Sequence, residues 1–402
     1  MVEVIRDERF DRFLAPQGDP DTIRRLAWRR SVLRFHILLA LRRELPSDEL
    51  SYLLDQLGSI SVDERHRVLA APEMALYIDA HLDKRAPSTD LAAPILTRIA
   101  SASSAPISKK ISWSGKLLLD YLPLGVRAIR MHGEDLNEPE LLLDDQLITL
   151  SSPLGGPTVQ VPVKATEMAF RNCFVRSDRL EIIDGWQPFC NVFDDGNASV
   201  YLDQHARATL TGLLSEAVAL IKVALPAALE EMQETAQYLS PIKPIDVNTS
   251  ELPSFSSPAI PGVIFVGIQQ GDGTWIDAQH LAESCIHEHL HNRLYLLNEA
   301  FPLTLQTEKP RSYFSPWKRT MRGIEGMLHA IYVFSHLAWF WRRVGDKLPE
   351  LDQYSTRCVD EQIEHLKTAT VEIDSEELTE AGRRVLSAST DILTTLTAET
   401  RV

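Results

Sequence analysis

The chain has 402 residues, of which 44% are hydrophobic and 24% are charged, as is typical of a globular protein with a sizeable core. Its formal net charge of −15 excludes general binding to nucleic-acid backbones, because such binding requires a basic surface. The four cysteines form no CxxC pair, which excludes a cysteine-rich zinc knuckle and argues against a disulfide framework.

Two further features concern the compartment. The N-terminus lacks the apolar core of a secretory signal. The longest strongly apolar stretch, residues 330–341, is too short to cross a bilayer. We therefore expect a cytoplasmic protein with reduced thiols that binds no membrane.

The first part of the chain has the pattern of helices. Residues 24–45 place apolar side chains at helical spacing and stop at Pro46, and the segments 47–57, 62–69 and 72–82 continue in the same style. A Ser- and Lys-rich linker follows. Residues 1–110 are therefore predicted to form a helical N-terminal region.

A mixed region is predicted for residues 111–250. Runs rich in β-branched residues, separated by Gly, Pro, Asn and Asp, predict short strands at 126–131, 146–150, 158–163 and 179–183, with a turn at 194–197. A long amphipathic helix is expected at 203–238, with a kink at Pro226, and a loop rich in Pro and Ser at 240–261.

Residues 251–402 are predicted to form a metal-binding catalytic region. A buried strand at 262–267 precedes a mostly helical remainder, and residues 374–377 look like a capping box that opens the last helix. The expected fold class is α+β and predominantly helical, with a small mixed β region between the helical N-terminal part and the helical C-terminal part.

One motif carries chemistry. Residues 277–297 read as one helix capped by Asp277. His287 and His291 lie four residues apart, so both imidazoles project from one face and can reach one metal ion. Glu288 follows His287 and can lean towards an open position of the metal, where it would orient or deprotonate a bound water. His289 points away from this pair, which suggests a surface or supporting position.

Two histidines need a third ligand from another helix. Arg322, Glu325 and His329 are spaced so that one helix face would carry all three. His329 would complete a three-nitrogen site, whereas Glu325 would complete the two-histidine, one-carboxylate site of Fe(II) oxygenases. The alternative without a metal role is a surface ion pair of Arg322 with Glu325 and a core His329.

Several segments together resemble the HExxH-type α-ketoglutarate-dependent peptide β-hydroxylases, which tailor ribosomally made peptides. The segments that carry the resemblance are 261–267, 281–291, 315–318, Arg322 and 327–330. The resemblance implies an Fe(II) site with α-ketoglutarate and O₂ as co-substrates. It assigns His287, His291 and His329 as ligands, and Arg322 as the residue that grips the distal carboxylate of α-ketoglutarate.

The expected function is therefore that of an oxidoreductase, an Fe(II)/α-ketoglutarate-dependent dioxygenase that β-hydroxylates a side chain of a precursor peptide. Glu288 would then support the site rather than act as the main base. A zinc metallopeptidase, with Glu288 as general base and Glu325 as third ligand, is the first alternative. A non-catalytic peptide-binding scaffold with a structural metal is the second. The expected partners are the precursor peptide and O₂, with homodimerisation left open.

Overall fold

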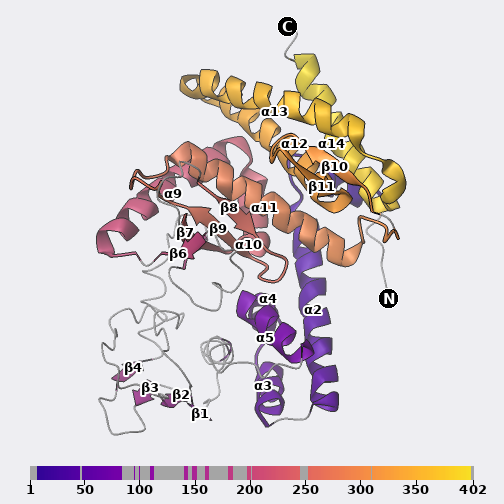
Figure 1. Cartoon of the computed structure of the whole chain (residues 1–402). Coiled ribbons are helices and arrows are strands. Elements are labelled where there is room, and N and C mark those ends of the chain that lie inside the picture. The colour runs from indigo at the N-terminus through magenta and orange to yellow at the C-terminus, as the bar shows by residue number, and fades with distance from the viewer. Residues whose placement is uncertain are drawn as a thin grey trace. The chain divides into compact units, whose positions relative to one another are not determined.

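The fold is described from a computed structural model of the chain (Figure 1). The structure describes residues 7–45, 48–83, 95, 99, 109–112, 140–143, 147–151, 159–162, 180–183, 197–200, 202–244, 252–308 and 310–399. The fold is α+β and predominantly helical, which confirms the predicted class. Among the described helices, none has the length and apolarity needed to cross a membrane.

The chain divides into two compact units, each assembled from separate stretches of sequence. Unit 1 consists of Met1–Leu26, Thr209–Ala236 and Ile276–Val402, and unit 2 of Ala27–Ala208 and Gln237–Trp275. The three consecutive regions expected from the sequence follow secondary-structure content rather than contacts, and they remain a prediction.

The predicted N-terminal helices are present. They are α1 (Asp7–Leu14), α2 (Pro20–Glu44), α3 (Asp48–Ser59), α4 (Val62–Ala70) and α5 (Pro72–Leu82). A capping box opens α4, because the Ser61 hydroxyl accepts from the Glu64 N–H while the Glu64 carboxylate accepts from the Ser61 N–H. Proline at the first position of α5 costs that helix no hydrogen bond.

The described residues of unit 2 form two sheets. The first is antiparallel, in the order β1 (Lys109–Ser112), β2 (Glu140–Leu143), β3 (Leu147–Ser151) and β4 (Val159–Pro162). The second has the order β5–β7–β9–β8, with β6 also paired to β7. Its strands are β5 (Glu181–Ile182), β6 (Asn197–Ser199), β7 (Tyr238–Pro244), β8 (Ser254–Ser256) and β9 (Val263–Gly267).

These strands confirm the predictions near 146–150, 158–163, 179–183 and 262–267. The predicted strand at 126–131 and most of the turn at 194–197 lie outside the described residues.

The loop predicted for 240–261 is wrong in part, because it contains most of β7 and all of β8. Pro241 lacks an N–H, but its carbonyl still accepts from the Val200 N–H at 3.1 Å. The buried side chains of Leu239 and Ile242 hold the strand in the core.

The long helix predicted for 203–238 is two helices. α9 (Gln204–Ala224) ends where Leu225 takes the non-helical angles φ −136° and ψ 72°, and α10 (Pro226–Thr235) begins at the proline. Proline cannot donate to the preceding turn, so the chain breaks at Pro226 instead of kinking.

In the described part of unit 1, the long helix α12 (Ile324–Lys347) packs most extensively against three other helices. They are α11 (Ala278–Ala300), α13 (Asp352–Glu372) and α14 (Glu380–Glu399). The side chain of Asp277 caps α11 by accepting from the His280 N–H at 2.7 Å, as predicted. The C-terminal half of unit 1 is shown in orange and yellow (Figure 1).

The predicted capping role of Asp374 at the last helix is wrong. Asp374 caps a single 3₁₀ turn, Ser375–Glu377, by accepting from the Glu376 N–H. The extended, fully buried Leu378 interrupts the chain before α14. The hydroxyl of Thr379 then accepts from the Gly382 N–H, so the threonine takes the capping role.

We expect Gly382→Ala to lower the free energy of unfolding by about 1–3 kcal/mol, because a Cβ there would collide with the Leu303 carbonyl oxygen. That oxygen accepts from the Thr379 N–H at 3.1 Å and cannot move away freely. Gly212→Ala in α9 is the control, since a Cβ there meets nothing within 4 Å. It should raise the stability by roughly 0.5–1 kcal/mol. Urea unfolding of both variants measures the difference, and equal stabilities would contradict the packing described.

Candidate metal centre

The helix α11 places the two histidines of the HExxH motif side by side. The rings of His287 and His291 have centroids 4.9 Å apart, as residues one helical turn apart on one face should. Both side chains are partly buried, and that of His287 keeps 21% exposure. The predicted pair is therefore formed. It lies on the side of α11 that faces His329 of α12.

The helix α12 supplies His329. Its Nδ1 lies 3.2 Å from Nδ1 of His291, and the two rings are nearly parallel with centroids 5.4 Å apart. His329 is 5% exposed, and its Nε2 has no hydrogen-bond partner within the described part of the chain. Two histidines that are 38 residues apart along the chain, on two different helices, thus bring their imidazole nitrogens into direct contact.

The separation of these nitrogens allows a test of fit. Two nitrogens bound at about 2.0–2.1 Å to one ion, at angles between octahedral and tetrahedral values, lie roughly 2.8–3.4 Å apart. The observed 3.2 Å meets this condition. It also suits an N–H···N hydrogen bond, which requires a proton on one of the two Nδ1 atoms.

His287 lies less close to the pair formed by His291 and His329. His287 contacts His291 through its ring. No three His, Cys, Asp or Glu side chains among the described residues converge tightly enough to be recognised as a metal-holding group. The fit to a metal thus rests on the chemistry of the three imidazoles and on the single distance between Nδ1 of His291 and Nδ1 of His329. Closing a three-nitrogen site would require His287 to approach the pair.

All three imidazoles are held neutral. Burial lowers the pKa of His287 to about 4, and the charge of Lys318 adds to this. Burial, followed by the charge of Arg322, lowers the pKa of His329 to about 4. The pKa of His291 is well below its usual value, first through burial and then through the other two histidines and both cations. A metal requires unprotonated imidazole, so this is the binding-competent form at neutral pH.

The spacing predicted that Arg322 and His329 share one helix face, and this prediction is wrong. Arg322 lies in β11 (Thr320–Gly323), which pairs with β10 (Ser312–Ser315), and α12 begins only at Ile324. The physical reason is the turn between the strands, where Arg319 adopts φ 52° and donates its N–H to the Ser315 carbonyl. The Arg322 side chain nevertheless lies over α12, because a Cβ on Gly326 would be 3.0 Å from its Nε.

The two candidate carboxylates lie in different surroundings. Glu288 is 1% exposed, and its Oε1 is 3.9 Å from Nε2 of His287. Glu325 is exposed in the first turn of α12, and no contact described here joins it to a candidate histidine. The structure thus brings Glu288 to the histidines and leaves Glu325 on the surface.

Aromatic side chains that the motif did not indicate surround the imidazoles. Phe334 contacts His287 with ring centroids 5.1 Å apart and stacks on Trp317 at 4.5 Å. Tyr295 lies 5.1 Å from His329. Two of these aromatic residues carried a sequence signal. Tyr295 continues the four-residue spacing of His287 and His291 along α11, and Trp317 lies in segment 315–318, which carries the resemblance.

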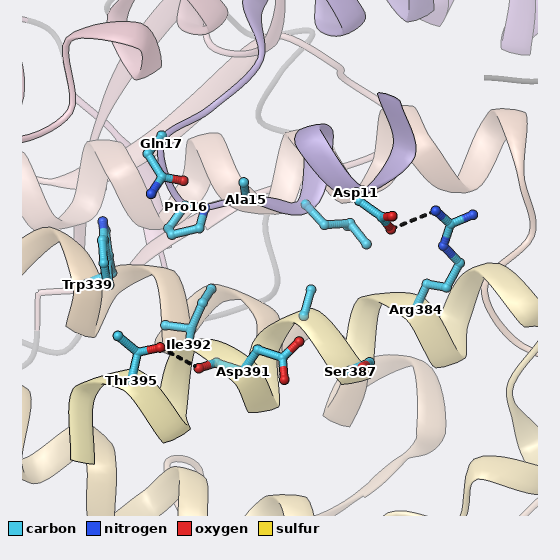
Figure 2. A pocket seen from close by; sticks show the side chains of 12 residues that line it. Asp11, Ala15, Pro16, Gln17, Trp339, Arg384, Ser387, Asp391, Ile392 and Thr395 are labelled. Atoms are coloured by element: carbon cyan, nitrogen blue, oxygen red, sulfur yellow. Dashed lines mark hydrogen bonds and ion pairs between the residues drawn. The ribbon is translucent and has the colours of Figure 1, made fainter. Parts of the chain in front are cut away.

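A separate hollow of about 370 Å³ in unit 1 contains none of these groups. It lies between α14, α12 and the segment after α1, with Trp339 at one end and the ion pair of Asp11 with Arg384 at the other (Figure 2). The candidate centre is therefore distinct from this hollow. No family model matches the sequence, and no curated protein matches it either.

We expect the purified protein to bind one Co(II) or Zn(II) ion per chain. His291→Ala and His329→Ala should each weaken binding by more than about 100-fold, because a directly bound nitrogen contributes more than the supporting groups whose loss costs roughly 10–100-fold. His280→Ala, in the first turn of the same helix, is the matched control and should bind as the wild type does. Calorimetric titration measures all four proteins, and unchanged affinity in both ligand variants would exclude this centre.

Proposed function

We propose that the chain is an Fe(II)/α-ketoglutarate-dependent dioxygenase that β-hydroxylates a side chain of a ribosomally made precursor peptide. The observation that carries the proposal is the 3.2 Å approach of His329 to His291. Burial lowers the pKa of both imidazoles, and the charge of Arg322 adds to this effect. A set of neutral imidazoles beside a guanidinium suits a metal that also holds a carboxylate co-substrate.

Bound iron, with α-ketoglutarate and O₂, would supply a two-electron oxidation that places one oxygen atom in a C–H bond and the other in succinate, with loss of CO₂. His287, His291 and His329 would hold the ion through lone pairs that burial keeps free of protons. Arg322 would bind the distal carboxylate of the co-substrate, for which its planar guanidinium offers two parallel donors.

The remaining groups around the histidines would shape the site. The stacked pair of Trp317 and Phe334 shields one side of His287, and the Trp317 indole N–H is held by Gln362 at 2.8 Å. Lys318 adds a second positive charge near His287 and His291. The combined charge favours an anionic co-substrate over a cationic one.

The hairpin of β10 and β11 offers a surface for a peptide beside these groups. Phe314 and Met321 are cross-strand neighbours and are 41% and 61% exposed, respectively. An apolar pair of this kind, in which Met321 lies in the same strand as Arg322, is suited to contact with an extended peptide. This supports a peptide substrate.

The zinc metallopeptidase remains a second candidate because of one observation. Glu288 is buried, with its Oε1 3.9 Å from Nε2 of His287, which is where a general base for a metal-bound water would be needed. The exposure of Glu325 argues against this candidate, because Glu325 is the third ligand that the peptidase would require and it lies outside the histidine cluster.

The first prediction concerns the co-substrate. Under anaerobic conditions, Fe(II) and α-ketoglutarate should give a charge-transfer band with the wild type. Arg322→Gln should weaken α-ketoglutarate binding roughly 10–150-fold, since hydrogen bonds to charged groups contribute about 1.5–3 kcal/mol. Gly326→Ala should weaken it as well, because the new Cβ displaces the guanidinium.

Gly323→Ala is the matched control for this titration, since a Cβ there meets nothing within 4 Å. It should retain the wild-type affinity for α-ketoglutarate, although losing the glycine at the helix N-cap will cost some stability. If the iron-loaded wild type shows no band and releases no succinate in air, the dioxygenase is excluded.

The second prediction separates the two enzymes. Glu288→Gln should leave succinate release by the iron-loaded protein measurable, because the proposed role of Glu288 is support of the site. In a zinc peptidase the same change would abolish hydrolysis, since it removes the general base. Succinate release and cleavage of labelled casein by the iron- and zinc-loaded forms decide between them. Casein cleavage that depends on zinc and Glu288 would replace the dioxygenase by the peptidase.

A further inference from the structure

The face of α11 opposite His287 and His291 carries two polar side chains that the proposed function does not use. His289 and Arg293 lie one turn apart and are 1% and 2% exposed. At about 100° per residue, His289 lies roughly 160° around the helix from either candidate ligand. Buried groups of this kind require partners, because an unpaired charge or N–H in the core is costly.

The partner is Glu231 of α10, which is fully buried. Its Oε2 lies 3.1 Å from Nε2 of His289 and 3.3 Å from Nε of Arg293, and its Oε1 accepts from the backbone N–H of Asp19. Burial by itself raises the pKa of Glu231, but Arg293, His289 and the Asp19 N–H together lower it below its usual value. The group is therefore a carboxylate, which can only accept, so Nε2 of His289 carries the proton.

The second nitrogen of His289 is also engaged. Its Nδ1 lies 2.6 Å from the hydroxyl of Thr235, which is buried at the end of α10. Contacts at both ring nitrogens fix the plane of the ring as well as its position. Helix α10 thus contacts α11 through directional polar bonds, in addition to apolar packing.

The same buried groups also hold the N-terminal segment of unit 1. Arg293 donates to the carbonyl of Phe13 and lies over its ring at 4.7 Å, and Nε2 of His336 in α12 is 3.0 Å from the carbonyl of Leu14. Gly18 has φ +86°, and a Cβ there would lie 2.9 Å from Oε1 of Glu231. Only glycine therefore allows the backbone to approach the carboxylate this closely.

We infer that Glu231, His289 and Arg293 are positioning residues that fix the rotation of α11 about its axis and thereby aim His287 and His291. A rotation of about 10° would move a nitrogen roughly 6 Å from the axis by about 1 Å, which is more than a metal site tolerates. Apolar packing by itself fixes this rotation less sharply than hydrogen bonds do, because apolar contacts have no preferred direction. The inference rests on the proposed metal centre, since it concerns the direction in which the ligands His287 and His291 point.

The experiment is a titration with Co(II), whose d–d absorption reports the arrangement of its ligands. His289→Leu should weaken Co(II) binding roughly 10–100-fold and shift the band, as losses of supporting groups in metal sites do. His289→Gln, which can still donate to Glu231, should restore most of the affinity. Thr235→Val, which removes one hydroxyl, should cause a smaller shift in the same direction.

Leu296→Ala is the control for destabilisation alone. Leu296 is a buried apolar residue of the same helix and lies roughly 140–180° around the helix from His291 and His287, so its truncation should lower the melting temperature and leave the Co(II) spectrum unchanged. If His289→Leu does not fold, Thr235→Val decides. Wild-type spectra and affinity in all the folded variants would overturn the inference while the metal centre stands. A wild type that binds no Co(II) would overturn the centre itself, and the inference with it.

Discussion

The approach of α12 to α11 is the contact on which the candidate centre depends. The two HExxH histidines are neighbours by virtue of one helix, but they become part of a cluster only where α12 brings His329 within 3.2 Å of His291. α12 can lie this close because it is buried along most of its length and packs against α11, α13 and α14. The helix that completes the cluster is therefore also the centre of the core of unit 1.

The two faces of α11 differ in the charge state of their buried groups. On the side of His287 and His291, burial and nearby cations keep the imidazoles neutral. On the other side, Glu231 stays ionised because Arg293 and two hydrogen bonds compensate for its burial. Neutral lone pairs are what a cation needs, whereas a paired charge gives directional anchoring. One helix thus separates the binding function from the anchoring function.

The hairpin of β10 and β11 carries both a residue of the candidate site and an exposed apolar pair. Arg322 and Tyr313 are cross-strand partners, and Tyr313 is buried with its hydroxyl donating to Glu377. Phe314 and Met321 are the next pair along the hairpin and are exposed. Because side chains alternate along a strand, a four-residue strand can direct one pair inward and its neighbour outward. In the proposed enzyme, Arg322 would face the co-substrate on the inner side of the hairpin, and the exposed pair would contact the peptide on its outer side.

The amino-acid sequence alone determined the features that depend on neighbouring residues. The Asp277 cap, the shared face of His287 and His291 and the buried strand β9 follow from short-range spacing, and the structure contains each of them. Local rules describe contacts within one turn or one strand, so they succeed there. The same rules placed Arg322 on a helix, since they did not register the left-handed turn at Arg319 that begins β11.

Only the tertiary structure decided which distant groups meet. The contact of His329 with His291, the exposure of Glu325 and the anchoring of His289 by Glu231 join residues 38 to 58 positions apart, or depend on how their helices pack. Spacing along one helix gives the direction of a side chain relative to its own axis, but not the rotation of that axis against its neighbours. That rotation is set by packing and by buried polar contacts, and these exist only once the chain has folded.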